Sequence, residues 1–447
     1  MLAPSTRDLS ADTVLHMIQT SATAEGHTAL DARMSHGAPS TDGLSNSATK
    51  GREVDRHQAI VVGAGSSGLA AAVALRRRGF ETIVIEKADT VGTSWRSRYA
   101  ELRLNSWRPM SKLQGRGMSR QCGRYPSRDD VVAYLERFAR QHGVAPRLRT
   151  ELVDVQREHD VWRLETSSGT MLCRHLVIAT GWDAVPCMPR WPGATTFDNE
   201  LIHSSELTSA AAYAGREVLV VGAGNSGLDI ASHLVKAGAR VTLSMRTPPN
   251  LASREVFGIP GQPILVFLGD HTPRVMADAM FRIVQRMTFG DVRRYGIPRS
   301  PIGVYANYRE NRRNPAVDDG FIAALKRGAA RVVGTVERLE GSDVVLADGA
   351  RLHPDTVICA TGYRRGLEPL VGHLGILGDD GIPIHHAGAP DHRLAPRLYF
   401  CGMWGQFSGQ IRLGPIHARR IARAASLDRR MRYRVSAGGS GSSGWLS

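Results

Sequence analysis

The sequence contains few lysines, and its cysteines are not closely spaced. Only five of its 57 basic residues are Lys, and its five Cys residues form neither a C-x-x-C pair nor a metal-ligand spacing. We therefore expect no metal site, no redox-active disulfide and a reducing, cytoplasmic location. No apolar run approaches the length of a membrane-spanning helix, and the first residues carry no signal-peptide pattern, so we predict no transmembrane segment.

Basic residues outnumber acidic ones, but they are not concentrated in one region. The net charge is +15, and the basic residues are spread along the chain rather than gathered into one stripe. Because a nucleic-acid-binding surface normally shows such a stripe, we predict a small-molecule substrate and no nucleic-acid partner. The 447 residues, 42% of them hydrophobic, suffice for an enzyme with two nucleotide-sized domains.

Both ends of the chain have compositions that cannot bury a core. Residues 1–56 are rich in Ser, Thr, Ala, Gly and Asp, and residues 431–447 include the run GGSGSSG. We predict a disordered N-terminal extension and a flexible C-terminal tail at these positions.

Between these ends the chain repeats one plan. An apolar strand at 59–62 runs into a glycine-rich turn and then a helix, and the same order begins again at 218–221. The turn glycines are Gly63, Gly65 and Gly68 in the first copy and Gly222, Gly224 and Gly227 in the second. Each copy closes with an apolar strand leading into Ala-Thr-Gly, which ends in Thr180 and Gly181 and again in Thr361 and Gly362. This pattern predicts a duplicated dinucleotide-binding domain.

The first copy has the features of an FAD site. Its glycines allow the turn to approach a pyrophosphate, while the following helix offers free N–H groups and the positive end of its dipole. The strand at 82–85 delivers Glu86, whose carboxylate can accept hydrogen bonds from a ribose diol. A last strand reaches Gly402, and we expect the final helix to point its N-terminus at the flavin ring.

The second copy differs at the position that corresponds to Glu86. Met245 stands there and is followed by Arg246, so no carboxylate is present to repel a phosphate. Ser244 and Arg246 are candidates to bind the 2′-phosphate of NADPH, because a guanidinium matches phosphate geometry. We therefore predict NADPH rather than NADH, with an exposed Arg at a strand end as the alternative interpretation.

The predicted fold class is α/β, with two Rossmann-like dinucleotide-binding domains and the NADPH domain inserted in the FAD domain. The expected FAD domain comprises 57–190 and 351–430, and the NADPH domain comprises 191–350. Within the latter, Pro, Gly and amphipathic helix patterns replace regular alternation at 247–314. We expect this insertion to shape the substrate site.

One helical pattern in the insertion, at 274–289, has a wide apolar face. The apolar face comprises Met276, Met280, Ile283, Val284 and Met287. Core packing is the default interpretation, and a substrate-channel wall or a peripheral membrane contact are the alternatives.

Several short motifs carry a family resemblance. They are GAGNSGLDIA at 222–231, CATGY at 359–363, YPSRDDVVAYL at 125–135, REVFG at 254–258 and the stretch 95–105. Over 58–425 the sequence resembles the flavin-containing monooxygenases and their plant YUCCA relatives. In that family Asn105, six residues after Tyr99, would lie over the isoalloxazine ring and help to hold the oxygen adduct, which makes it the implied catalytic residue.

The glycine turns, the strand ends and the family resemblance together predict which residues contact each cofactor. The FAD contacts are Gly63, Gly65, Ser67, Gly68, Glu86, Trp95, Asn105, Thr180, Gly181 and Gly402. The NADPH contacts are Gly222, Gly224, Asn225, Ser226, Gly227, Ser244, Arg246, Thr361 and Gly362.

One family signature departs from its pattern. The fingerprint F-x-G-x-x-x-H-x-x-x-aromatic stands here as Phe197, Asn199, His203 and Leu207, without its glycine and its final aromatic residue. The missing aromatic speaks against a Baeyer–Villiger monooxygenase, whose fingerprint ends in Trp. We interpret His203 as a structural histidine between the domains.

The resemblance implies that NADPH reduces FAD, that O2 adds to the flavin as a C4a-hydroperoxide, and that this adduct oxygenates a small nucleophile containing nitrogen or sulfur. Three alternatives stay open. They are an NADPH:acceptor oxidoreductase or NADPH oxidase, a YUCCA-like oxidative decarboxylation of a 2-oxo acid, and a flavoprotein binding module without turnover.

Overall fold

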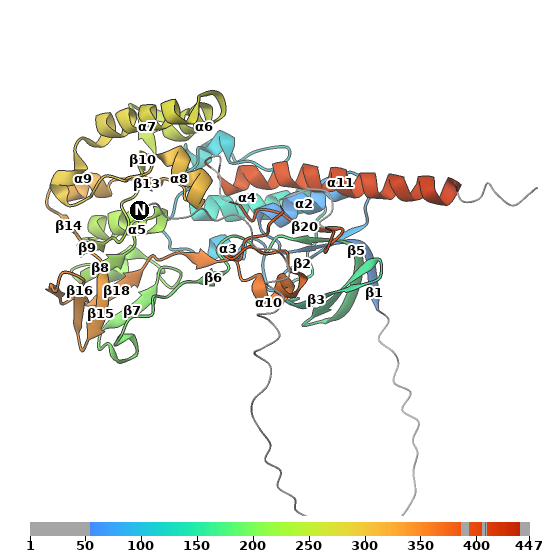
Figure 1. Cartoon of the computed structure of the whole chain (residues 1–447), viewed down its shortest axis with the longest axis horizontal. Helices are drawn as coiled ribbons and strands as arrows, with labels where there is room; N and C mark the ends of the chain where they lie inside the picture. The colour runs from blue at the N-terminus through green and yellow to red at the C-terminus, as the bar shows by residue number, and fades with distance from the viewer. Residues whose placement is uncertain (1–53, 386–392, 405–406, 408, 439–447) are drawn as a thin grey trace, which may run out of the picture. The chain divides into compact units, whose positions relative to one another are not determined.

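The structure is a computed structural model that describes residues 54–385, 393–404, 407 and 409–438. Two sheets of mainly parallel strands occupy this part of the chain, and each carries helices (Figure 1). The predicted α/β class with two Rossmann-like units is confirmed. Most of the predicted N-terminal extension and the end of the predicted tail lie outside the described residues.

The first sheet has six strands, in the order β2-β1-β5-β4-β3, with β20 beside the second half of β5. β1 lies parallel to both β2 and β5, and its last four residues are all buried, as expected for a strand covered on both faces. The strands are β1 (Asp55–Val62), β2 (Thr82–Ile85), β3 (Leu152–Glu158), β4 (Val161–Thr166), β5 (Gly169–Ile178) and β20 (Leu398–Phe400).

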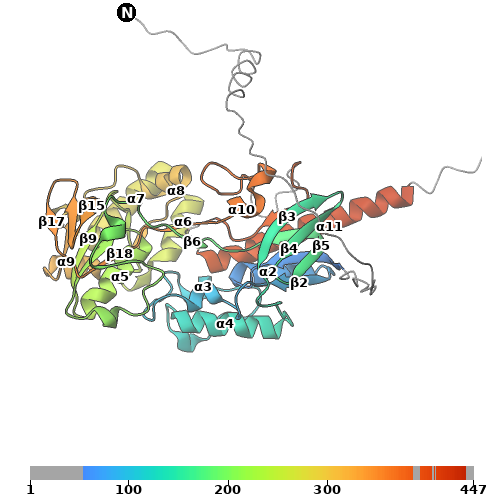
Figure 2. The ribbon, with the colours of Figure 1, turned by 90° about the horizontal axis from the view of Figure 1, so that it is seen from below.

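Small side chains let two helices pack closely on one face of this sheet. α2 contains four Ala residues within its buried stretch and lies against α11, as Figures 1 and 2 show. α4 begins with a capping box formed by Ser127 and Asp130. The helices of this first unit are α2 (Ser66–Arg76), α3 (Thr93–Arg96), α4 (Arg128–Gln141), α10 (Glu368–Val371) and α11 (Gln410–Gly438).

The second sheet is wholly parallel, in the order β14-β9-β8-β18-β7. One face packs on α5 and α9, and the other packs on an antiparallel meander of three strands, β15 to β17. The sheet strands are β7 (Glu200–His203), β8 (Glu217–Val221), β9 (Arg240–Ser244), β14 (Ala330–Val333) and β18 (Thr356–Cys359). The remaining elements are α5 (Asn225–Lys236), α9 (Phe321–Lys326), β15 (Val336–Glu340), β16 (Asp343–Leu346) and β17 (Arg351–Leu352).

The predicted insertion is a group of helices and two small strand pairs between β9 and β14. Its elements are β10 (Leu251–Ser253), β11 (Glu255–Val256), β12 (Ile259–Pro260), α6 (Gly261–His271), α7 (Arg274–Phe289), α8 (Val304–Asn311) and β13 (Ala316–Asp318). Short 3-10 helices complete the fold at Arg108–Met110, Arg120–Cys122, Ala194–Thr196, Ala210–Tyr213, Val292–Tyr295 and Gly372–Leu374.

The second unit is inserted in the first, as predicted. After the second sheet is complete, β20 returns to pair with β5 of the first sheet. Two connections join the units, and they pair with each other as the short strands β6 (Val185–Pro186) and β19 (Tyr363–Arg364).

Three predicted boundaries are wrong. Asp55 and Arg56 already belong to β1, because their backbone pairs with β5, so the FAD-side unit does not begin at 57. Residues 351–362 belong to the NADPH-side unit and not to the FAD side, because the all-buried strand β18 fits between β7 and β8. α11 continues to Gly438 through the predicted tail at 431–438, since no Gly or Pro interrupts 431–437 before the helix end.

The default interpretation of the 274–289 pattern is also wrong. In α7 the exposed fractions are 57% for Met276, 60% for Ile283 and 62% for Met287, so most of the apolar face is not core. The helix packs instead through Ala277, Asp278 and Phe281, which lie on its other side. The apolar periodicity located the helix correctly but not the face that it buries.

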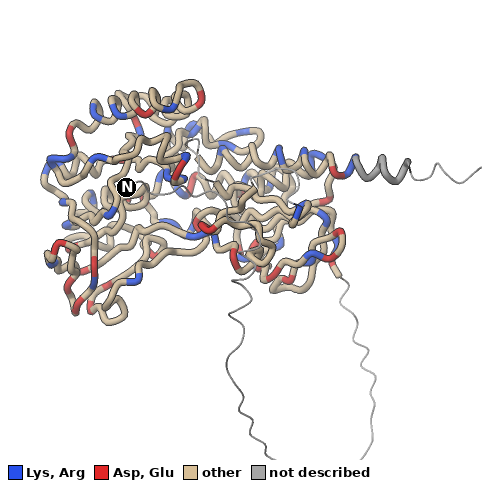
Figure 3. Tube along the Cα trace, viewed as in Figure 1, with Lys and Arg blue, Asp and Glu red and all other residues tan. Residues whose placement is uncertain are grey.

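Basic and acidic positions are interspersed along the chain trace of both units (Figure 3). None of the described helices is both long and apolar enough to cross a membrane.

Candidate active site

The two glycine-rich turns have nearly the same geometry. Gly63 and Gly222, at the ends of β1 and β8, have φ angles of +106° and +113°, which favour glycine. A Cβ atom on Gly68 would lie 1.8 Å from the carbonyl oxygen of Gly63, and a Cβ on Gly227 would lie 1.8 Å from that of Gly222. These glycines are therefore needed for the close packing of helix on strand.

The middle glycine of each turn faces open space. A Cβ atom on Gly65 or on Gly224 would meet no atom within 4 Å. The helices that follow, α2 and α5, have no side-chain cap and no acidic residue in the first turn, so their leading N–H groups are free to bind an anion. Both turns thus fit the pyrophosphate of a dinucleotide.

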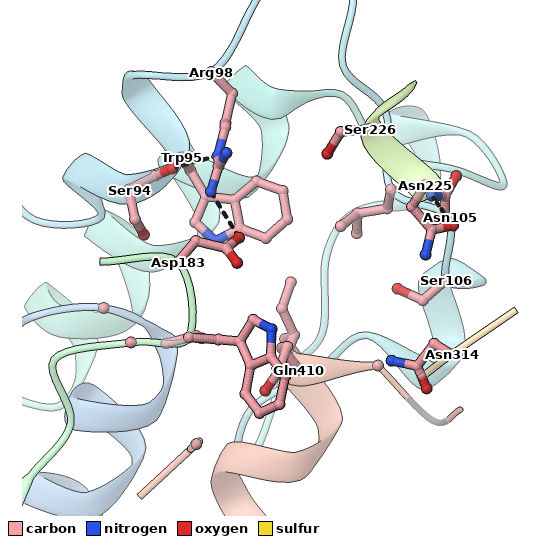
Figure 4. A pocket seen from close by; sticks show the side chains of 18 of the residues that line it. Ser94, Trp95, Arg98, Asn105, Ser106, Asp183, Asn225, Ser226, Asn314 and Gln410 are labelled. Atoms are coloured by element: carbon pink, nitrogen blue, oxygen red, sulfur yellow. Dashed lines mark hydrogen bonds and ion pairs between the residues drawn. The ribbon is translucent and has the colours of Figure 1, made fainter. Parts of the chain in front are cut away.

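A cavity of about 1020 Å³ runs from the first turn into the insertion (Figure 4). Its walls contain most of the predicted FAD contacts and two of the predicted NADPH contacts. These are Gly63, Gly65, Ser67, Glu86, Trp95, Asn105, Thr180, Gly181 and Gly402 for FAD, and Asn225 and Ser226 for NADPH. Gly68 lies behind its turn, and the remaining NADPH contacts lie outside these walls.

Two polar side chains of the first unit fit a bound FAD. The Glu86 carboxylate accepts hydrogen bonds from the backbone N–H groups of Ala64 and Ala88, at 2.7 and 3.0 Å, which fix it at the end of β2. The buried hydroxyl oxygen of Thr180 lines the cavity and has no hydrogen-bond partner among the described residues. A buried unpaired hydroxyl is costly, so a ligand that bonds it would relieve that cost.

The last helix also reaches this cavity. Gly402 has a φ of +80°, and a Cβ atom there would lie 2.1 Å from the hydroxyl of Ser67, so the strand end β20 lies tight against the first turn. Gln410 and Ile411, the first residues of α11, line the cavity. The positive end of the α11 dipole therefore faces the cavity in which FAD is predicted to bind.

Asn105 lies where the two units meet, beside Asn225 (Figure 4). Its side-chain oxygen accepts a hydrogen bond from Nη2 of Arg254 at 2.9 Å, and its Nδ2 donates to Oδ1 of Asn225 at 3.4 Å. Asn225 is fixed in turn, since its Oδ1 accepts from the N–H of Val317 and its Nδ2 donates to the carbonyl of Pro315. The predicted catalytic residue is thus joined to the predicted NADPH motif.

The two residues predicted to bind the 2′-phosphate, Ser244 and Arg246, differ in their exposure to solvent. Ser244 is 1% exposed, and its hydroxyl donates to the carbonyl of Gly334 at 2.7 Å. Contrary to the prediction, Ser244 is not placed to bind a phosphate, because its side chain points inward from β9. Arg246, two residues later, is exposed and stays the candidate. Thr361 donates to the carbonyl of Cys187 on the neighbouring connection.

His203 has the contacts of a structural residue at the connection between the units. Its Nε2 lies 3.1 Å from the carbonyl oxygen of Gly362, its Nδ1 lies 2.8 Å from the hydroxyl of Ser205, and its ring packs edge-on against Tyr363. Burial lowers the pKa of His203, so the imidazole is neutral at neutral pH. Leu207, which stands in place of the family's aromatic residue, is buried in the core of the second sheet.

Sequence reasoning assigned no role to two residues that prove central. Arg98 donates to Asp183 at 2.7 Å and lies over the ring of Tyr363, so it contacts both connections between the units. Arg254 lines the cavity and holds Asn105. The REVFG motif marked Arg254 as a family residue, but a motif alone does not show which side chains that residue contacts.

Comparison with known proteins shows the family. Residues 60–257 match the model of the pyridine nucleotide-disulphide oxidoreductase family. The chain is 34% identical over 310 residues to indole-3-pyruvate monooxygenase YUCCA1 of Oryza sativa subsp. japonica, a match that covers 68% of this chain and 76% of that relative. The chain belongs to the flavin-containing monooxygenase family. As a member it is a flavin-dependent monooxygenase, which agrees with the predicted cofactors FAD and NADPH.

Solved structures share the fold of this monooxygenase. A flavin-containing monooxygenase from Stenotrophomonas maltophilia superposes with a TM-score of 0.65 at 21% identity, covering 84% of this chain and all of that one. The bacillithiol disulfide reductase Bdr from Staphylococcus aureus gives 0.61 at 18%, again over 84% of this chain and all of that one. At these identities the likeness concerns the fold and not the chemistry.

The glycine geometry generates a paired prediction. In Gly65→Ala the added methyl group enters the space expected for the FAD pyrophosphate, while in Gly224→Ala it enters the space expected for NADPH. Such crowding costs about 1–3 kcal/mol, or roughly a tenfold to hundredfold loss of affinity. Flavin absorbance per protein should fall only in Gly65→Ala, and the Kd for NADP+ should rise in Gly224→Ala.

The control for this pair is Gly68→Ala, whose methyl group would collide with the protein itself. It should lower the melting temperature of the flavin-free protein, which Gly65→Ala should leave unchanged. Full flavin content in folded Gly65→Ala would contradict the assignment of the first turn.

The burial of His203 generates a pH prediction. The pKa of His203 in the folded protein lies below the usual 6.5, so the unfolded state binds a proton more readily. The free energy of unfolding therefore falls as the pH drops below about 6.5. His203→Gln should therefore melt below wild type at pH 7.5, and the gap in Tm should shrink towards pH 5.5. A gap that widens on acidification would contradict this account.

Proposed function

We propose that this monooxygenase uses NADPH and O2 to oxygenate a small, largely apolar nucleophile that contains nitrogen or sulfur. The observation that carries the proposal is the continuity of one cavity from the first glycine turn, past Asn105 and Asn225, into the insertion. Flavin, nicotinamide and substrate can then meet in one cavity.

In this proposal the first turn, Glu86 and Thr180 would hold FAD, with the Glu86 carboxylate accepting hydrogen bonds from a ribose. The second turn and Arg246 would hold NADPH, with the guanidinium binding the 2′-phosphate. When bound, FAD supplies the redox chemistry by taking a hydride from NADPH and passing electrons to O2. The protein's own part is to orient both groups, to hold hydrogen bonds at the flavin through Asn105 and to exclude water.

The insertion supplies the walls expected for an apolar substrate. Leu251, Ile264, Leu265, Leu268 and Phe281 line the cavity there, with the neutral amides of Gln262 and Asn314. Arg254 is the only charged residue among the described insertion residues in these walls. It is paired with Asp319 at 2.6 Å and lies 3.5 Å from Asp229, so its charge is already compensated.

The relative's name makes oxidative decarboxylation of a 2-oxo acid the second candidate. A carboxylate substrate is bound best by an uncompensated cation or several donors. Among the described residues on the insertion side of the cavity the one cation, Arg254, is compensated and is a poor partner for it. A substrate panel separates the two. Under ¹⁸O2, thioethers and tertiary amines should consume NADPH and gain one labelled oxygen atom, whereas turnover of 2-oxo acids alone with release of CO2 would favour the second candidate.

The phosphate assignment gives a coenzyme prediction. Arg246→Ala removes a charge-assisted bond that only the 2′-phosphate can make, worth about 1.5–3 kcal/mol. The KM for NADPH should rise about tenfold to hundredfold, and that for NADH should change little. Arg240→Ala changes an exposed Arg at the start of β9 that pairs with Glu217. It is the matched control and should change neither value. Equal increases in KM for NADPH and NADH would contradict the assignment of Arg246 to the 2′-phosphate.

The position of Asn105 gives a prediction about coupling. Hydride transfer depends mainly on how the two rings stack, so flavin reduction by NADPH without oxygen should stay near wild type in Asn105→Ala. The lost hydrogen bond, about 1.5–3 kcal/mol, should raise the ratio of hydrogen peroxide to oxygenated product by roughly tenfold or more. The exposed Asn311→Ala on α8 is the control. An unchanged ratio in Asn105→Ala would end the catalytic role of this residue.

A further inference from the structure

A charged cluster is buried beside Asn105, and the proposed chemistry does not use it. Asp229 on α5 is 2% exposed, and Arg254, just after β10, is 7% exposed. The two residues belong to the GAGNSGLDIA and REVFG motifs. Burying a charge is costly unless the charge is paired, so a buried charged cluster at this position suggests a specific role.

Arg254 is held from several sides. Its Nη1 donates to Asp319 at 2.6 Å, its Nη2 donates to the side-chain oxygen of Asn105 at 2.9 Å, and the same Nη2 lies 3.5 Å from Oδ1 of Asp229. The guanidinium lies over the ring of Tyr125, 5.3 Å from its centre, and Tyr125 donates its hydroxyl to the carbonyl of Arg254. Side chain and backbone are therefore both fixed.

Asp229 is anchored to the flavin-side segment. Its Oδ2 accepts a hydrogen bond from the hydroxyl of Tyr99, and its Oδ1 lies 3.7 Å from Nε2 of His233. Burial raises the pKa of Asp229, while the bond from Tyr99 and the charges of His233 and Arg254 oppose that rise. The carboxylate and the guanidinium thus stabilise each other in a place where neither would be stable alone.

We propose that Arg254 is a positioning residue that fixes the amide of Asn105 with its oxygen towards the guanidinium and its N–H groups towards Asn225 and the cavity. An Asn amide fits the same space in two orientations, and hydrogen-bond partners alone choose between them. A guanidinium donates hydrogen bonds and cannot accept them. In the flipped orientation the N–H groups of Asn105 would face the N–H groups of Arg254, with no acceptor between them. This orientation is therefore excluded.

The other side of Asn105 selects the same orientation. Oδ1 of Asn225 is held as an acceptor by the N–H of Val317, so the group that faces it must be a donor. Arg254 and Asn225 come from different parts of the second unit, and together they leave Asn105 one orientation. With one N–H bonded to Asn225, the second N–H of Nδ2 is available to a ligand in the cavity.

The inference rests on the proposed role of Asn105, but it is tested by readouts that need no substrate. The full-length holoenzyme is compared as wild type, Arg254→Met, Arg254→Lys, Asn105→Ala and the double variant Arg254→Met/Asn105→Ala. The readouts are the ¹⁵N side-chain amide signal of Asn105 in the oxidised protein, anaerobic flavin reduction by NADPH, and peroxide release from the reduced protein with NADP+ bound. Arg124→Met, which removes an exposed ion pair with Glu255, is the matched control.

Arg254→Met should shift the Asn105 amide signal and speed peroxide release about tenfold, as Asn105→Ala does, with anaerobic reduction near wild type. The double variant should release peroxide no faster than Asn105→Ala alone, because Arg254 acts through that amide. Arg254→Lys, which keeps the charge and only donates, should recover most of the wild-type behaviour. The control should match wild type throughout.

Independent, multiplying effects in the double variant would overturn the inference, as would an unshifted amide signal. A higher NADPH concentration for half-maximal anaerobic flavin reduction, with unchanged peroxide release, would also overturn it, since Arg254 would then bind the coenzyme directly. If Arg254→Met does not fold, Asp319→Asn takes its place, with a smaller shift in the same directions expected and no shift as the contrary result. If the wild type makes only peroxide from every substrate, the proposed function fails while these comparisons still test Arg254.

Discussion

The arrangement of the cavity depends on the docking of one flavin-side segment, residues 98–105, against the second unit. The buried hydrogen bond from Tyr99 to Asp229 is its anchor. The ring of Tyr99 packs in the core of the second sheet, and the Glu101 carboxylate accepts bonds from the hydroxyl of Ser209 and the N–H of Ala210. Because this segment continues directly into Asn105, its docking sets where the first unit meets the second glycine turn.

Duplication explains why such a contact is needed. Each strand, turn and helix builds a site for one dinucleotide, but nothing in either copy fixes its distance from the other. The two connections, which pair as β6 and β19 and which Arg98 contacts at Asp183 and Tyr363, set the path of the chain between the units. The Tyr99–Asp229–Arg254–Asn105 cluster then holds the facing surfaces together at the point where the two cofactors are expected to meet.

Features that depend on local sequence were predictable, and features that depend on distant contacts were not. The glycine turns and Glu86 follow from residues within one strand–turn–helix unit, and the structure has them in the predicted places. The inward direction of Ser244 depends on Gly334, 90 positions away, and the role of Arg254 depends on Asn105, 149 positions away. The exposed face of α7 was missed because periodicity marks an apolar face without saying what covers it.

The central claim is that FAD and the nicotinamide end of NADPH meet in one shared cavity, with NADP+ beside Asn105 while the flavin reacts with oxygen. The most direct test is the rate at which chemically reduced enzyme releases hydrogen peroxide in oxygenated buffer, measured with and without saturating NADP+. A shared cavity predicts clearly slower peroxide release with NADP+ bound, because the bound nucleotide excludes water from the flavin. The same rate with and without NADP+ would contradict the account.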